Sequence, residues 1–82
     1  MRIELDQNIN EFKVQLRGVL PSRFKVDAWS TDTGAKYWRC EIRLGRNLYW
    51  GEFNINVIAS PYDMAVMVRA IKSHMPGVRC SA

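Results

Sequence analysis

The sequence is poor in the residue types on which most catalytic and metal sites depend. It has one histidine, His74, and two cysteines, Cys40 and Cys80, which lie far apart in the chain. Two distant thiols and one imidazole provide neither a disulfide framework nor the ligands of a structural zinc site. No glycine-rich phosphate loop, HExxH motif or paired-carboxylate signature occurs. We therefore expect a protein that is not an enzyme and that uses no metal or cofactor.

The one nominal catalytic pair is Cys40 with His74, as nucleophile and base. Cys40 falls on the apolar side of a predicted strand, and no third residue is marked as an orienting group for the histidine. His74 lies in the last turn of a predicted helix, where an imidazole interacts favourably with the helix dipole. The pattern therefore favours structural roles for both residues.

Long apolar runs are also missing. The longest, from Met64 to Val68, is far too short to span a bilayer. The first residues, MRIELD, carry acids where a signal peptide would be apolar. We expect a cytoplasmic chain with reduced thiols and no membrane partner.

A length of 82 residues allows one hydrophobic core, and 48% hydrophobic residues is ordinary for a folded domain. Neither an internal repeat nor a linker interrupts the chain. The sequence therefore predicts a single domain over residues 1–82, with residues 77–82 as a loose tail.

The hydrophobic pattern changes along the chain from a helical period to a strand period and back. Apolar residues recur every three or four positions near both ends and every second position in the middle. This order predicts an α-β-β-β-α chain and an α+β fold, in which a three-stranded antiparallel sheet carries both helices on one face. The predicted elements are a helix over 8–20, strands over 23–29, 37–44 and 48–53 (or as far as 57), and a helix over 61–75.

Capping signals and apolar stripes support the two helices. Asn8 with Glu11 resembles a capping box for the first helix, and Ser60, Pro61 and Asp63 form the start signal of the second. The stripe predicted for the first helix is Ile9, Phe12, Leu16, Val19 and Leu20. The stripe predicted for the second helix is Met64, Met67, Val68, Ile71 and Met75.

The strand pattern gives each hairpin a predicted register. Pairing Trp29 with Tyr37 in the first hairpin would place Asp27 opposite Arg39 and Lys25 opposite Glu41, so opposite charges would face each other. For the second hairpin, the leading prediction is a three-residue loop over 45–47, with Asn47 in a left-handed conformation. Because Leu48 and Trp50 differ in parity from Phe53, this register needs a bulge near Gly51.

A two-residue turn at Gly45 and Arg46 is the alternative for the second hairpin. It pairs Leu44 with Asn47, turns Tyr49 inward, and leaves Leu48 and Trp50 on the outer face of the sheet. The two registers therefore predict different surfaces.

The positive charge is concentrated in the first two strands and their turns. Of the formal net charge of +4, residues 17–46 carry seven basic against three acidic side chains. Basic side chains interleaved with aromatic rings suit nucleic acid, since cations neutralise phosphates and rings stack on bases. The leading functional prediction is therefore a nucleic-acid-binding module, for DNA or RNA. The residues predicted to bind are Arg23, Lys25, Trp29, Tyr37, Arg39, Arg43, Arg46 and Tyr49.

The alternative prediction is a small protein-binding adaptor or inhibitor, of the kind that phages and other mobile elements encode. It would act through a sheet edge or an exposed apolar patch of Leu48 and Trp50, with Tyr62 as a further contact. Its partner would be a protein with an acidic surface, and the chain itself would be a monomer or homodimer.

Two families resemble parts of this pattern. The α-β-β-β-α order is similar to that of the double-stranded-RNA-binding domain, which holds phosphates with lysines where this chain has residues 60–63, SPYD. Segments 38–43 (WRCEIR) and 48–53 (LYWGEF) resemble the second and third strands of AP2-type DNA-binding domains. That resemblance implies that Glu41, Arg43 and Tyr49 read DNA from the sheet.

Overall fold

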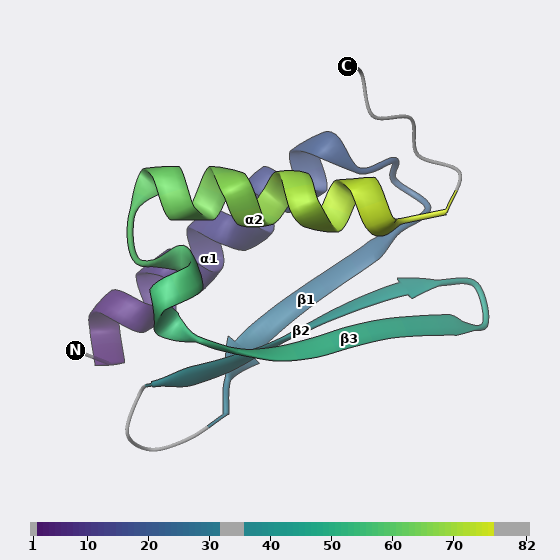
Figure 1. Cartoon of the computed structure of the whole chain (residues 1–82). Coiled ribbons are helices and arrows are strands. Elements are labelled where there is room, and N and C mark those ends of the chain that lie inside the picture. The colour runs from purple at the N-terminus through teal and green to yellow at the C-terminus, as the bar shows by residue number, and fades with distance from the viewer. Residues whose placement is uncertain (1, 32–35, 77–82) are drawn as a thin grey trace.

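The computed structural model describes residues 2–31 and 36–76, with side chains from residue 5 onward, and it confirms the predicted order (Figure 1). The predicted loose tail, 77–82, and part of the predicted first turn lie outside the described residues. The elements are α1 (Arg2–Val19), β1 (Lys25–Ser30), β2 (Tyr37–Leu44), β3 (Asn47–Asn54), the 3-10 helix η1 (Ile55–Ile58) and α2 (Pro61–His74).

The molecule has two layers, with both helices on the same side of the antiparallel sheet β1-β2-β3 (Figure 1). Trp38 of β2 is fully buried at the centre of the core. Its ring meets Phe12 of α1 edge-on at 5.1 Å and lies 5.2 Å from Phe53 of β3. These aromatic contacts hold the helix layer on one face of the sheet, and no described helix covers the opposite face (Figure 1).

The first helix begins earlier than the sequence indicated. Asn8 is not its N-cap but lies within α1, where its side chain donates a hydrogen bond to the Ile58 carbonyl (3.1 Å). Leu5, fully buried, extends the apolar stripe by one helical turn. At the other end Val19, predicted to be buried, is 39% exposed.

The second helix follows its prediction closely. The Ser60 hydroxyl caps it by accepting a hydrogen bond from the Asp63 N–H (3.1 Å), and Pro61 occupies the first position. Met64, Val68 and Met75 are buried as predicted. Neither helix in the described ranges is long and apolar enough to cross a bilayer.

The first hairpin is shifted by two residues from its predicted register. Trp29 pairs with Arg39 rather than with Tyr37, and β1 begins at Lys25. A two-residue shift preserves which side each residue faces, so Phe24, Val26 and Ala28 are buried as expected. It also replaces the expected opposite-charge pairs by like-charge pairs, Lys25 with Arg43 and Asp27 with Glu41.

The second hairpin adopts the alternative register. Leu44 pairs with Asn47 around a two-residue turn, so the predicted three-residue loop with a left-handed Asn47 is wrong. Gly45 supplies the positive φ that this turn needs, at 60°. The pairing continues past Gly51 without the predicted bulge. That bulge was expected because Ile55 and Val57 share the parity of Phe53, but both residues belong to η1 and not to the strand.

Candidate functional site

The outer face of the sheet, opposite the helices, gathers most of the residues predicted to bind a partner. Strand alternation assigns every second residue to this face, because the intervening residues are in the core. We use the name outer face for Lys25, Asp27, Trp29, Tyr37, Arg39, Glu41, Arg43, Leu48, Trp50, Glu52 and Asn54.

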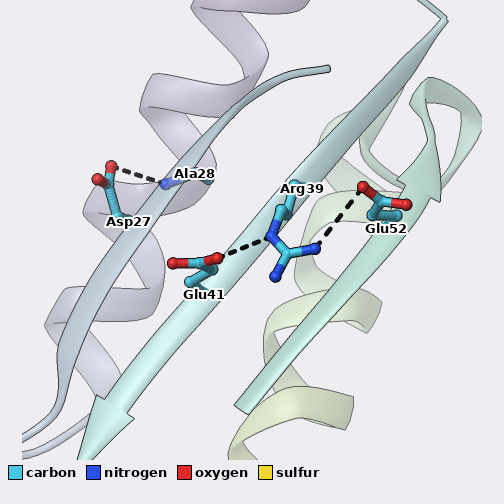
Figure 2. A network of polar contacts seen from close by, with 5 residues as sticks. All are labelled: Asp27, Ala28, Arg39, Glu41 and Glu52. Atoms are coloured by element: carbon cyan, nitrogen blue, oxygen red, sulfur yellow. Dashed lines mark hydrogen bonds and ion pairs between the residues drawn. The ribbon is translucent and has the colours of Figure 1, made fainter. Parts of the chain in front are cut away.

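Arg39 lies at the centre of the outer face, and its guanidinium contacts the carboxylates of Glu41 and Glu52 (Figure 2) and the ring of Trp50. Its Nε donates to a Glu41 carboxylate oxygen at 2.8 Å, and its Nη1 lies 3.7 Å from Glu52. Its Cζ lies 4.1 Å from the centroid of the Trp50 ring, a cation–π contact. Arg39, predicted to neutralise a phosphate, therefore already has two carboxylate partners.

The same contacts hold Trp50 in place. Its indole rests on Arg39, yet 59% of the residue is exposed. Leu48, two positions earlier on the same strand, is 39% exposed. Because the two-residue turn before β3 sets the register of this strand, both residues lie on the outer face rather than in the core. Together they form an apolar patch beside an ordered cation.

Two further aromatic residues extend this patch toward the other strands. Trp29 of β1, the direct cross-strand partner of Arg39, is 41% exposed. Tyr37 lies one outward position before Arg39 on β2 and is also exposed. The rings of Trp29 and Tyr37 thus lie on the outer face, as predicted, and Trp50 joins them there as the alternative register required, with Arg39 among them.

The charges of the outer face balance. Its three basic residues are Lys25, Arg39 and Arg43, and its three acidic residues are Asp27, Glu41 and Glu52. The excess positive charge of the chain therefore lies elsewhere, in part at Arg23 and Arg46. Arg23 precedes β1 and lies over the Phe24 ring at 5.1 Å, whereas Arg46 is exposed in the turn before β3.

Lys25 and Arg43 are the cations of the outer face with no acid in contact. They lie directly opposite each other, and within the described ranges neither forms an ion pair. With Arg17 they line a shallow concavity that also includes Asp27 and Glu41. Like charges directly opposite destabilise a sheet, so an anion bound here would relieve a repulsion.

Tyr49 lies on the other side of the sheet from its predicted position. It points toward the helix layer and lines an apolar cleft of about 110 Å³ between β3 and the last part of α2. Ile42, Phe53, Ile71 and Met75 also line this cleft. Tyr49 is therefore not available on the outer face for stacking on a base.

Tyr62 is separated from the other predicted protein-binding residues. It is 77% exposed at the start of α2, in the helix layer, beside Val66 and a shallow apolar depression. Leu48 and Trp50 lie on the outer face, the side of the sheet away from the helices. The fold therefore brings together two of these three residues.

Cys40 and His74 are in unrelated environments. Cys40 is buried on the inner side of β2, and burial, with smaller contributions from Asp27 and Glu41, raises the pKa of its thiol to about 12. His74 is exposed, with its Nδ1 2.8 Å from the Ala70 carbonyl oxygen. A protonated, buried thiol is a poor nucleophile. Across the described part of the chain, no three His, Cys, Asp or Glu side chains are placed to hold a metal ion.

Comparisons of the chain with protein-family models, curated proteins and solved structures gave no match. The function is therefore inferred from the surface itself. The sequence pattern indicated most residues of the outer face, but the leading register did not place Glu52 beside Arg39. The alternative register contained that signal, because it places Glu52 directly opposite Arg39.

Proposed function

We propose that the chain is a non-enzymatic protein-binding module that contacts its partner through the outer face of the sheet. The observation that carries this proposal is the exposed Trp50, held on Arg39 and flanked by Leu48. The residue types of this face, Trp, Tyr and Arg, are those that dominate the binding energy of protein interfaces.

Trp50 contributes through both burial and order. Covering an exposed aromatic side chain stabilises a complex by roughly 1.5–3 kcal/mol. Because Arg39 already fixes the ring, little rotamer entropy is lost when a partner covers it. A rigid aromatic anchor is therefore present before binding.

The charge balance indicates the chemistry of the partner surface. With three cations and three acids, the outer face fits a partner that is apolar at its centre and carries mixed charges at its rim. Binding should then depend weakly on ionic strength, since long-range attraction contributes little.

Site-specific photocrosslinking in the cells that produce the chain tests this proposal. A benzophenone amino acid at Trp29, on the outer face but far from the β3 edge, should capture one discrete protein. The same probe at Val14, which is 68% exposed on α1, is the matched control and should capture none. Capture from position 14 alone would contradict the proposal.

The captured partner then allows a quantitative test. Trp50→Ala should weaken binding of the purified partner by roughly thirtyfold, as expected for a hot-spot residue. Val14→Ala should leave the affinity unchanged, and both variants should keep the thermal stability of the original chain. Equal affinities for Trp50→Ala and the original chain would refute the role of the patch.

Nucleic-acid binding is the second candidate, favoured by the cross-strand pair of Lys25 and Arg43. To test it, the purified chain is titrated with short single-stranded RNA and with duplex DNA at two salt concentrations. If Lys25, Arg43 and Arg46 meet phosphates, log K on duplex DNA should fall with log salt at a slope of about −2.7. Binding that is absent, or that ignores salt, would eliminate this candidate.

A further inference from the structure

The two edges of the sheet differ in how their backbone groups are satisfied. Residues of an antiparallel strand alternate between bonding one neighbour and pointing away from it. The Thr31 N–H donates to the Tyr37 carbonyl (3.1 Å), so the outward residues of β2 bond β1. The inward residues of β2 must then bond β3, and the Ile55 N–H donating to the Lys36 carbonyl (2.7 Å) continues that ladder.

This alternation determines which groups lie at each edge. On β3 the inward residues Tyr49, Gly51 and Phe53 bond β2. The N–H and C=O groups of Leu48, Trp50 and Glu52 therefore point away from the sheet. On β1 the corresponding edge residues are Val26 and Ala28.

The edge of β1 is capped by side chains. The Val26 carbonyl accepts a hydrogen bond from Arg17 Nη2 at 2.7 Å, and the Ala28 N–H donates to Asp27 Oδ1 at 2.8 Å (Figure 2). Lys13 holds the same carboxylate oxygen at 3.5 Å. A strand that approached this edge would have to displace these contacts.

On β3 the edge carbonyl of Asn54, the last residue, accepts a hydrogen bond from Trp38 Nε1 (3.2 Å), but the edge from Leu48 to Glu52 has no such protection. Among the described residues, no group outside the strand bonds the edge N–H or C=O of Leu48, Trp50 or Glu52. The strand is eight residues long and contains no proline, lysine or bulge, the usual devices that block strand addition. Among the described residues, side chains thus cap two backbone groups of the β1 edge, whereas the edge groups of Leu48, Trp50 and Glu52 are uncapped.

We propose that β3 pairs antiparallel with β3 of a second copy of the chain. The result is a two-fold symmetric dimer with one continuous six-stranded sheet. This inference goes beyond the proposed function, because it concerns association of the purified chain with itself through the backbone edge of β3.

Self-complementarity of the edge residues argues for a second copy as the occupant. When the two-fold axis passes through Tyr49, Leu48 lies opposite Trp50 of the second copy and Arg46 lies opposite Glu52 of the second copy. By symmetry each contact forms twice, so two apolar pairs and two ion pairs arise together. Leu48 and Trp50 would exchange about four backbone hydrogen bonds across the axis.

The neighbouring registers match less well. With the axis at Trp50, Leu48 faces Glu52 of the second copy and no opposite charges meet. With the axis at Gly51, Trp50 faces Glu52 and Leu48 faces Asn54. Of these three registers, the one centred on Tyr49 pairs apolar residues with each other and brings opposite charges together.

The inner side of the edge adds apolar area in the same register. Tyr49 would lie against Tyr49 of the second copy, in a non-hydrogen-bonded pair whose side chains approach closely. Each Tyr49 ring borders the apolar cleft of its own copy, which Ile71 and Met75 also line. The dimer would therefore extend the core across the two-fold axis.

A charge-swap experiment tests the dimer and its register together. Sedimentation velocity of the purified chain, from low micromolar to several hundred micromolar, should show a monomer–dimer equilibrium. Arg46→Glu alone and Glu52→Arg alone should each raise the dissociation constant about tenfold or more, because both ion pairs become repulsions. An equimolar mixture of the two variants should restore dimerisation, since every charge pair is then opposite in sign.

The controls separate association from folding. Lys25→Glu makes the same charge change as Arg46→Glu, but on β1, and should dimerise like the original chain. Circular dichroism should show that each variant is folded. Amide exchange should slow with increasing concentration at Leu48, Trp50 and Glu52, and not at Val26.

A chain that stays monomeric throughout this concentration range would overturn the proposal. A dimer whose dissociation constant is unchanged by both charge swaps would also overturn it. So would the finding that a strand of another protein pairs with the β3 edge. None of these results bears on crosslinking from position 29, so the two proposals fail separately.

Discussion

Neighbouring residues on β2 alternate between two environments, and Arg39 and Cys40 show how different these are. Arg39 lies on the outer face, where its guanidinium contacts Glu41 and the Trp50 ring. Cys40 faces the core, where desolvation raises its thiol pKa to about 12. The thiol therefore packs as a small apolar group at neutral pH, and its protonation is coupled to folding.

This coupling predicts a loss of stability in alkaline solution. The thiol pKa is about 12 in the folded chain against 9.0 as the reference value, so between these values only the unfolded state releases the proton. Stability from this group is complete below pH 9 and falls as pH rises toward 12. Urea unfolding at pH 8 and pH 10 should show the original chain losing roughly 1 kcal/mol more than Cys40→Ala. Equal losses would contradict a raised thiol pKa.

At the scale of elements, the beginning of α1 shows where sequence reasoning stopped short. The capping pattern at Asn8 was misleading, because that side chain instead ties α1 to η1 through the Ile58 carbonyl. Leu5, four residues before Ile9, carried the signal for an earlier start. A capping motif describes a few residues, whereas burial depends on the whole helix.

Replacing Leu5 by alanine tests whether the first turns of α1 belong to the fold. Leu5→Ala should lower the free energy of unfolding by about 2–5 kcal/mol, because it leaves a cavity at a fully buried position. Val14→Ala, on the exposed side of the same helix, should change it by less than about 0.5 kcal/mol. Thermal or urea unfolding gives both values. A negligible effect at Leu5 would mean that the helix begins nearer Asn8.

Element types and the inward faces of β1 and β2 could be predicted from the sequence, but the register of the first hairpin could not. Alternation in β1 and β2 identified Val26, Ala28, Trp38 and Ile42 as core residues, because parity survives a two-residue shift. The register shift of the first hairpin depends on the length of the connection between β1 and β2, which the hydrophobic pattern does not determine.

The inward face of the third strand was harder to predict, because the apolar residues of the following 3-10 helix obscured the alternation of the strand. Ile55 and Val57 continue the inward parity of Phe53 in the sequence, yet they belong to η1 rather than to β3. Once η1 is separated, Tyr49 and Phe53 suffice as the inward set, and Gly45 permits the tight turn. The exposure of Trp50 therefore depends on the two-residue turn before β3.

At the scale of the whole molecule, the sheet is a layer with two edges of opposite character. The Cα extents of 36 × 29 × 16 Å describe a flattened body, with helices on one side and the outer face on the other. Because Arg17 and Asp27 cap two groups of the β1 edge, we expect pairing through β3 to end at two copies. A sheet with two open edges would instead add copies without limit.

Removing the caps of β1 should therefore change the size of the assembly. In the double variant Arg17→Met and Asp27→Ala, the Val26 carbonyl and the Ala28 N–H lose their side-chain partners and become available to another strand. Sedimentation velocity should show species larger than a dimer whose amount grows with concentration. Arg43→Met, which removes an exposed arginine without freeing an edge group, should show none. If β3 does not self-associate, the double variant should stop at a dimer formed through β1, because a chain with one usable edge cannot extend further.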